Sequence, residues 1–304
     1  MRKTLFLSLC AVSLMAIVAC NQAKNTEEDT SDVKKISRIY YLGGDDTVNG
    51  QLLYEMHWDG DTLRSLTYSL HDDDDIITPE QNTITKNPFK YTESYTYADG
   101  HLTRKDNDFF VITYTYSGDQ LTRIDQHTHD GLHFYRIDYE YADSGVVNLA
   151  YYSASKEVIR SAEAVIYNRR DTLGNEIRPA MPADTSLHLS GHATLHTTEG
   201  NITAVHTEFI DDQGSISTEI TYDDKVNPFY GMYIQSPSLD VSFASLPFGI
   251  SDLCPIRNNP TQTKGIMTIA KDQTLPFDNA YNYDYEGNYP VTDHFNKYRI
   301  EYVK

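Results

Sequence analysis

The sequence predicts an all-β protein, an antiparallel up-and-down meander of hairpin repeats that is strongly curved or barrel-like and carries a short helical insertion. The first observation behind this prediction is that the 24 tyrosines recur in Tyr-x-Tyr pairs. The second is that turn residues, and then a leucine or isoleucine, follow several of these pairs. The third is an alternation of apolar and charged residues, which is typical of half-buried strands. Hairpins of ordinary strand length would give about 12–16 strands.

The chain begins with a segment that predicts export. Residues 1–19 combine Arg2 and Lys3 with an apolar run that is shorter than a dependable membrane span, so they are typical of a signal peptide. The run ends in Ile-Val-Ala-Cys, and Cys20 is therefore the predicted lipidation site. Residues 20–35 are polar and predict a flexible tether, which leaves 36–304 as a single β-meander domain.

The repeats that follow carry hairpin turns. Residues 116–123 (YSGDQLTR) repeat the pattern of residues 97–104 (YADGHLTR), and weaker copies of the pattern begin at Trp58, Thr198 and Asp212. Asp-Gly and Gly-Asp supply the positive φ angles that tight hairpins require. Each copy therefore predicts one β-hairpin, and stacked copies predict the meander.

The alternation is clearest in residues 134–141 (FYRIDYEY), where aromatic and aliphatic residues share one face and charged residues share the other. Residues 298–302 (YRIEY) repeat it at the end of the chain. The remaining Tyr-x-Tyr pairs are Tyr95/Tyr97, Tyr114/Tyr116 and Tyr281/Tyr283/Tyr285.

Three segments interrupt the meander. An acidic loop is expected at 71–89, a break near 178–185, and a proline-rich insertion at 225–265 that contains a short helix at 236–246. Residues 153–165 would suit a helix by composition, but we interpret them as a hairpin because strand-like segments flank them.

The Tyr-x-Tyr…Gly-x-Leu-x-Arg rhythm resembles the YD-type repeats of secreted bacterial proteins. Together with the lipobox, the segment 222–229 (YDDKVNPF) and the tyrosine-rich end, it resembles a Bacteroidetes lipoprotein family that is defined as a domain of unknown function with a porin-like sheet. The resemblance covers most of residues 36–304 and implies a strongly curved antiparallel sheet at the outer membrane. It implies no activity and assigns no functional residues.

Composition narrows the choice of partners. The chain has 44 acidic and 25 basic residues, which argues against nucleic acid as a partner. Of the three cysteines, Cys10 leaves with the signal and Cys20 carries lipid, so Cys254 has no partner for an intrachain disulfide. No nucleophile elbow, P-loop or dinucleotide-binding glycine pattern is present, and we expect no cofactor and no enzyme activity.

Four tyrosines are candidate ligand-binding residues. Aromatic rings on a curved sheet can stack on sugars or line an apolar cavity, although packing in the core is their more common role. The candidates are Tyr97, Tyr116, Tyr139 and Tyr141.

Histidines supply a candidate metal site. His127 and His129 are two residues apart on a predicted strand and share a face, and the turn at Gly131 could bring His133 close. Polar residues at a hairpin tip are the commoner explanation. Residues 188–196 hold three histidines spaced by four, but on a strand neighbouring rings would stand roughly 13 Å apart, too far to share one ion.

These observations leave three hypotheses about function. The leading one is a non-catalytic, lipid-anchored outer-membrane protein that binds a lipid or other apolar ligand, a glycan, or an envelope protein. The second is an extracytoplasmic hydrolase whose carboxylates or histidines meet in the fold. The third is a purely structural envelope protein.

Overall fold

The computed structural model describes residues 34–42, 50–70, 89–107, 110–142, 145–159 with 161, 182–210, 214–230, 256–269, 273–292 and 298–304. The predicted signal, most of the tether, most of the acidic loop, the first half of the expected break and the helix expected at 236–246 lie outside these residues. Within them there is no helix with the length and apolar character needed to cross a membrane.

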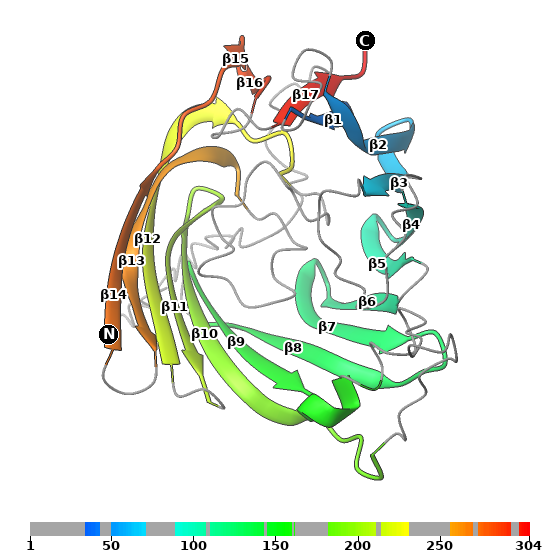
Figure 1. Ribbon diagram of the computed structural model, residues 1–304, viewed down its shortest axis with the longest axis vertical. Coiled ribbons are helices and arrows are strands. Elements are labelled where there is room, and N and C mark those ends of the chain that lie inside the picture. Colours follow the sequence, from blue (N-terminus) through cyan, green and yellow to red (C-terminus); the bar gives the residue numbers. More distant parts are fainter. Residues whose placement is uncertain are drawn as a thin grey trace, which may run out of the picture.

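Fifteen strands form one antiparallel sheet, which confirms the predicted fold class. Its strands are β1 (Ile36–Tyr41), β2 (Gln51–Asp59), β3 (Thr62–Leu70), β4 (Phe89–Ala98), β5 (His101–Asp106), β6 (Phe110–Ser117), β7 (Gln120–Thr128), β8 (His133–Tyr141), β9 (Val146–Ser153), β10 (His188–Thr198), β11 (Asn201–Phe209), β12 (Gly214–Val226), β13 (Asn258–Ile269), β14 (Gln273–Ala280) and β17 (Tyr298–Tyr302). Neighbours in sequence are neighbours in the sheet from β1 to β14, and β17 pairs with β1. Figure 1 shows these strands following one another around a strongly curved sheet.

The sheet is open. β14 and β17 stand at its two ends, and no strand pairing joins them in the described part of the chain. A small hairpin of β15 (Tyr285–Glu286) and β16 (Tyr289–Pro290) lies between them in the chain. The Val226 amide donates to the Asn288 carbonyl at 3.1 Å, and the Tyr302 hydroxyl donates to the Pro290 carbonyl at 2.6 Å. The small hairpin thus links β12 to β17 without closing the sheet.

The predicted hairpin repeats share one register. Trp58, Tyr97, Tyr116 and Thr197 each pair with the leucine or isoleucine five residues later, across a turn at Gly60, Gly100, Gly118 or Gly200 that has a positive φ. In each hairpin a β-bulge follows that leucine or isoleucine. In three of them the bulged residue is a threonine (Thr103, Thr122 or Thr203) whose hydroxyl donates to the carbonyl seven residues earlier, at 3.1–3.3 Å.

The bulge decides which residues face the core. Beyond it the alternation of faces is reset, so that the arginine of Leu-Thr-Arg turns outward and the next residue turns inward. The inward residues at this position are Leu66, Lys105, Ile124 and Val205, all of which are buried. Three hairpins therefore place an aliphatic side chain where the β4–β5 hairpin places a lysine.

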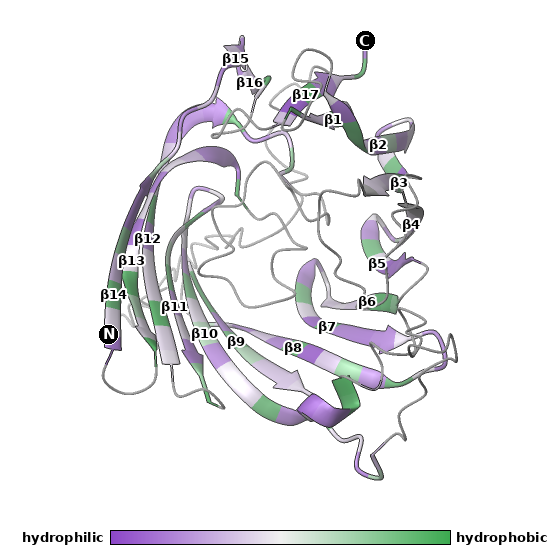
Figure 2. Cartoon of the chain, in the orientation of Figure 1, coloured by the Kyte–Doolittle hydropathy of each residue, from purple (hydrophilic) through white to green (hydrophobic). Residues whose placement is uncertain are grey.

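One face of the sheet, called here the inner face, carries the main core. A single cluster of buried aliphatic and aromatic side chains runs from Ile36 and Ile39 of β1 through Leu149 of β9 to Ile300 of β17. Hydrophobic and hydrophilic segments alternate along the strands in Figure 2, as expected for a sheet with one apolar face. The outer face is the opposite one.

Three expectations about secondary structure were wrong. The insertion expected at 225–265 ends earlier, because residues 258–265 are part of β13 and pair with β12. Residues 156–159 and 161 are helical, although 153–165 was interpreted as a hairpin. The helical turn buries Val158 against Phe134 and Ala154, and this second small core favours helix over strand there. Tyr281 and Tyr283 lie beyond the end of β14 rather than on a strand. The Tyr281 amide bonds the Thr261 carbonyl at 2.9 Å and its hydroxyl bonds Thr263 Oγ1 at 2.7 Å, which holds this segment against β13 instead.

Candidate functional site

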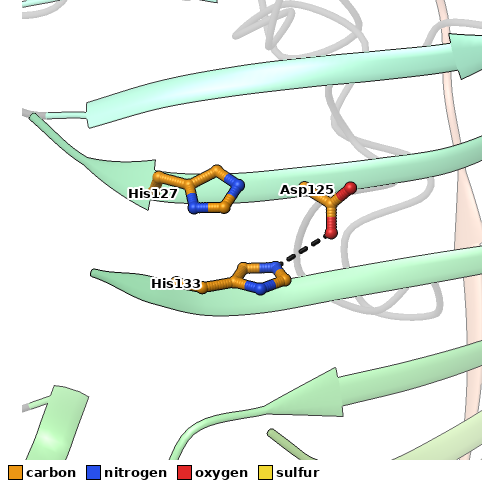
Figure 3. A group of neighbouring side chains, drawn as sticks. All are labelled: Asp125, His127 and His133. Atoms are coloured by element: carbon orange, nitrogen blue, oxygen red, sulfur yellow. Dashed lines mark ion pairs between the residues drawn. The ribbon is translucent and has the colours of Figure 1, made fainter. Parts of the chain in front are cut away.

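The β7–β8 hairpin brings three potential metal ligands together on the outer face. On β7, Ile124, Gln126 and Thr128 are buried, so the alternate residues Asp125 and His127 face the other way. His133 begins β8 and pairs directly with His127. Figure 3 shows the Asp125, His127 and His133 side chains side by side, with the two imidazole rings one above the other.

A β-bulge aims His133 at this cluster. Gln126 pairs with Tyr135, but His127 pairs with His133, so Phe134 is the extra residue. In a regular ladder Phe134 would oppose His127 and His133 would turn to the inner face. Phe134 instead packs, 7% exposed, against Ala154 and Val158. The second small core therefore holds the bulge that presents His133.

The three side chains are close enough to share a ligand. Nε2 of His133 lies 2.9 Å from Oδ1 of Asp125. The rings of His127 and His133 stack with centroids 4.3 Å apart and an angle of 25° between their planes. One ligand atom from each of the three residues lies within 4.8 Å of the other two. In the described part of the chain, no other group of three such side chains meets this condition.

The electrostatic surroundings favour a neutral His127. Partial burial is the larger cause and the neighbouring His133 the second, and together they lower the pKa of His127 below its usual 6.5. Of the nearby arginines, Arg123 donates to Oδ1 of Asp138 at 2.7 Å, and Nε of Arg136 forms an ion pair with Oδ2 of Asp138 at 3.4 Å. The Asp125 carboxylate is thus engaged by His133 while Asp138 takes both arginines.

His129 lies apart from this cluster. β7 ends at Thr128, because the Thr128 amide bonds the Leu132 carbonyl at 2.9 Å and the turn starts there. Nε2 of His129 lies 2.6 Å from the Asn107 carbonyl and 3.7 Å from Oδ1 of Asp106. The structure therefore joins His127 and His133 to Asp125, which sequence reasoning missed. The available signal was the Asp-x-His pair, whose members share a face on any strand.

The candidate tyrosines form a second feature on the inner face. Tyr97, Tyr116, Tyr139 and Tyr141 are partly buried and pack against the main core, as Trp58 does. Trp58, Tyr97 and Tyr116 hold equivalent positions in successive hairpins, and Tyr141 ends β8 beside its turn. We call these five residues the aromatic rim. They follow one end of the sheet, where the turns at Gly60, Gly100 and Gly118 lie.

A buried ion pair lies on the same inner face. Nζ of Lys105 is 3.2 Å from Oε1 of Glu93, and both side chains are less than 5% exposed. The Tyr95 hydroxyl donates to the same oxygen at 2.6 Å and the Tyr68 hydroxyl at 3.4 Å. Burial, followed by the Glu93 charge, raises the pKa of Tyr95, which keeps this donor protonated.

No protein-family model matches this chain, and no curated protein matches it in sequence. The solved structures that are similar to it include two described as porin-like proteins. The one from Bacteroides vulgatus ATCC 8482 is 12% identical over 89% of this chain and 99% of its own, with a TM-score of 0.38. The one from Bacteroides uniformis ATCC 8492 is 13% identical over 83% of this chain and 85% of its own, with a TM-score of 0.43. At these values neither carries an argument about the function of this chain.

Proposed function

We propose that this chain is a non-catalytic cell-envelope protein that is anchored to the outer membrane by lipid on Cys20 and binds a ligand on its aromatic rim. The observation that carries the binding proposal is the recurrence of a partly buried aromatic side chain at the same position of successive hairpins. Core packing would explain a fully buried residue, but each residue of the rim is only partly buried. A row of such rings suits flat or apolar ligands, which are sugars and acyl chains.

Binding fits this inner face better than acid–base chemistry does. The buried charged side chains of the described residues are Glu93 and Lys105, and they neutralise each other across 3.2 Å. The acidic composition of the chain suits a soluble domain held beside a membrane rather than one that binds an anionic surface.

The anchor is tested by metabolic labelling of cells with an alkyne fatty acid. The full chain should incorporate the label and sediment with outer membranes, whereas Cys20→Ser should incorporate none. Labelling of Cys20→Ser at the level of the unaltered chain would refute lipidation at this residue.

The rim is tested through Trp58, the single tryptophan of the chain and itself a rim residue. Titration of the full chain with palmitate, and separately with a neutral oligosaccharide, should give a saturable change in fluorescence for one of them. Tyr97→Ala and Tyr116→Ala should each weaken binding by about 2–10-fold, since an aromatic contact contributes about 0.5–1.5 kcal/mol. Tyr152→Ala, on the outer face beneath Arg136, is the matched control and should leave the affinity unchanged. No saturable change with either probe would refute the proposal.

A further inference from the structure

We propose that Asp125, His127 and His133 bind a divalent transition-metal ion on the outer face of the sheet. This inference goes beyond ligand binding on the aromatic rim, because the two sets of residues lie on opposite faces. It depends on the register of one hairpin and on the side chains that the hairpin presents there.

The donor set selects the class of ion. Two imidazole nitrogens and one carboxylate oxygen suit Zn²⁺, Cu²⁺ and Ni²⁺. Ca²⁺ and Mg²⁺ prefer six or more oxygen ligands and would find one carboxylate here. Copper should bind more tightly than zinc or nickel, in line with the general order of affinities for such ligands.

The geometry needs only small side-chain adjustments to hold such an ion. Zinc bonds of about 2.1 Å in a tetrahedral site place ligand atoms about 3.4 Å apart. The ligand atoms of the three residues already lie within 4.8 Å of one another. The hairpin backbone can stay in place, because direct pairing of His127 with His133 sets the two rings against each other.

Neighbouring groups support the ligands. Nε2 of His133 lies 3.0 Å from the Tyr135 carbonyl, so ligation through Nδ1 would leave the Nε2–H to donate to that carbonyl and orient the ring, as backbone carbonyls do for ligating histidines. Val111, 7% exposed, pairs with His127 from β6 and gives the cluster one apolar wall. Arg123 and Arg136 both contact Asp138, and the Arg123 charge also acts on Asp125.

Three protein ligands leave a coordination position for water or another donor. The His133 side chain is 31% exposed and the Asp125 side chain 17% exposed, so an ion can enter from solvent. Sites of this kind exchange their metal, whereas structural zinc sites are closed by four protein ligands. The centre should therefore load and release metal without unfolding the sheet.

The test is calorimetric titration of the full chain, purified in detergent without a polyhistidine tag and stripped with a chelator. Zn²⁺ and Ni²⁺ should each bind with saturation at one equivalent per chain, and Mg²⁺ should not bind. His127→Ala and His133→Ala should each lower the affinity at least about 100-fold, and Asp125→Asn at least about 10-fold. His129→Ala, in the same hairpin but outside the cluster, is the matched control and should change the affinity less than about 3-fold.

Circular dichroism and Trp58 fluorescence should show that every variant keeps the fold. The proposal is overturned if the unaltered chain shows no saturable binding. It is also overturned if binding survives in folded His127→Ala and His133→Ala, or if folded His129→Ala loses as much affinity as they do.

Discussion

Replacing Lys105 with Leu should destabilise the protein strongly, even though leucine suits this position in the fold. The equivalent residues of three other hairpins are Leu66, Ile124 and Val205, so this position of a hairpin accommodates an aliphatic side chain. The cost comes from the partner, because the Glu93 carboxylate would stay buried, 4% exposed, without its cation.

The magnitude follows from the distance. Two unit charges 3.2 Å apart attract by about 5 kcal/mol at an effective dielectric constant of about 20. The variant no longer has to bury a lysine charge, and the absence of that desolvation cost offsets part of the lost attraction. The Tyr95 hydroxyl, 2.6 Å from Oε1 of Glu93, continues to stabilise the Glu93 carboxylate. We expect the free energy of unfolding to fall by about 3–5 kcal/mol, as for other buried pairs that lose one member. The free energy of unfolding of the double variant Glu93→Gln with Lys105→Leu should be within about 2 kcal/mol of that of the unaltered chain, because neither charge of the pair remains.

The assay is urea unfolding followed by the fluorescence of Trp58, whose indole nitrogen donates to the Ile36 carbonyl at 2.7 Å. Arg64→Met is the control, since it removes an exposed pair with Asp59 and should cost less than about 1 kcal/mol. A loss below about 1 kcal/mol in Lys105→Leu would refute this reasoning. So would a double variant as unstable as the single one.

The other predictions concern glycines and the core. Ala at Gly100, where φ is +82° and space is open, should lower the free energy of unfolding by about 1–2 kcal/mol. Asn at this position should restore most of that stability, because Asn tolerates this backbone region. Ala at Gly265 would place its Cβ 2.0 Å from the Ser217 carbonyl oxygen and should lower the free energy of unfolding by about 3 kcal/mol. Asn should not restore stability at this position. If urea unfolding showed that Asn restores stability equally at both glycines, this contrast would be contradicted. Phe229→Ala should lower the free energy of unfolding by about 3–5 kcal/mol because the side chain is fully buried. Tyr230, which is 38% exposed, is the control. If Phe229→Ala lowers the thermal unfolding temperature no more than Tyr230→Ala does, the packing argument fails.

Bulges link several of these observations. The bulge after the leucine in the β4–β5 hairpin turns Arg104 outward and Lys105 inward, which creates the buried ion pair. The bulge at Phe134 turns His133 outward and creates the metal cluster. In both places one extra residue moves a functional side chain from one face of the sheet to the other.

The sequence by itself determined the fold class and the hairpins. Turn chemistry and alternation act over a few residues, so Tyr97 and Leu102 could be paired across Asp-Gly without knowledge of the rest of the chain. The same local rules placed His127 and His133 on adjacent strands and predicted a bridging turn between them.

The tertiary structure alone decided the composition of the sites and the ends of the sheet. Strict alternation from Leu102 would leave Lys105 on the outer face, and strict alternation from His127 would keep His129 beside it, although β7 ends at Thr128. Each error arises because a bulge or a strand end shifts the alternation by one residue, and packing against distant segments sets those shifts. Val158 and Phe134 are 24 positions apart, and β1 and β17 come from opposite ends of the chain. Contacts at such separations depend on the whole sheet, because no local pattern along the chain records them.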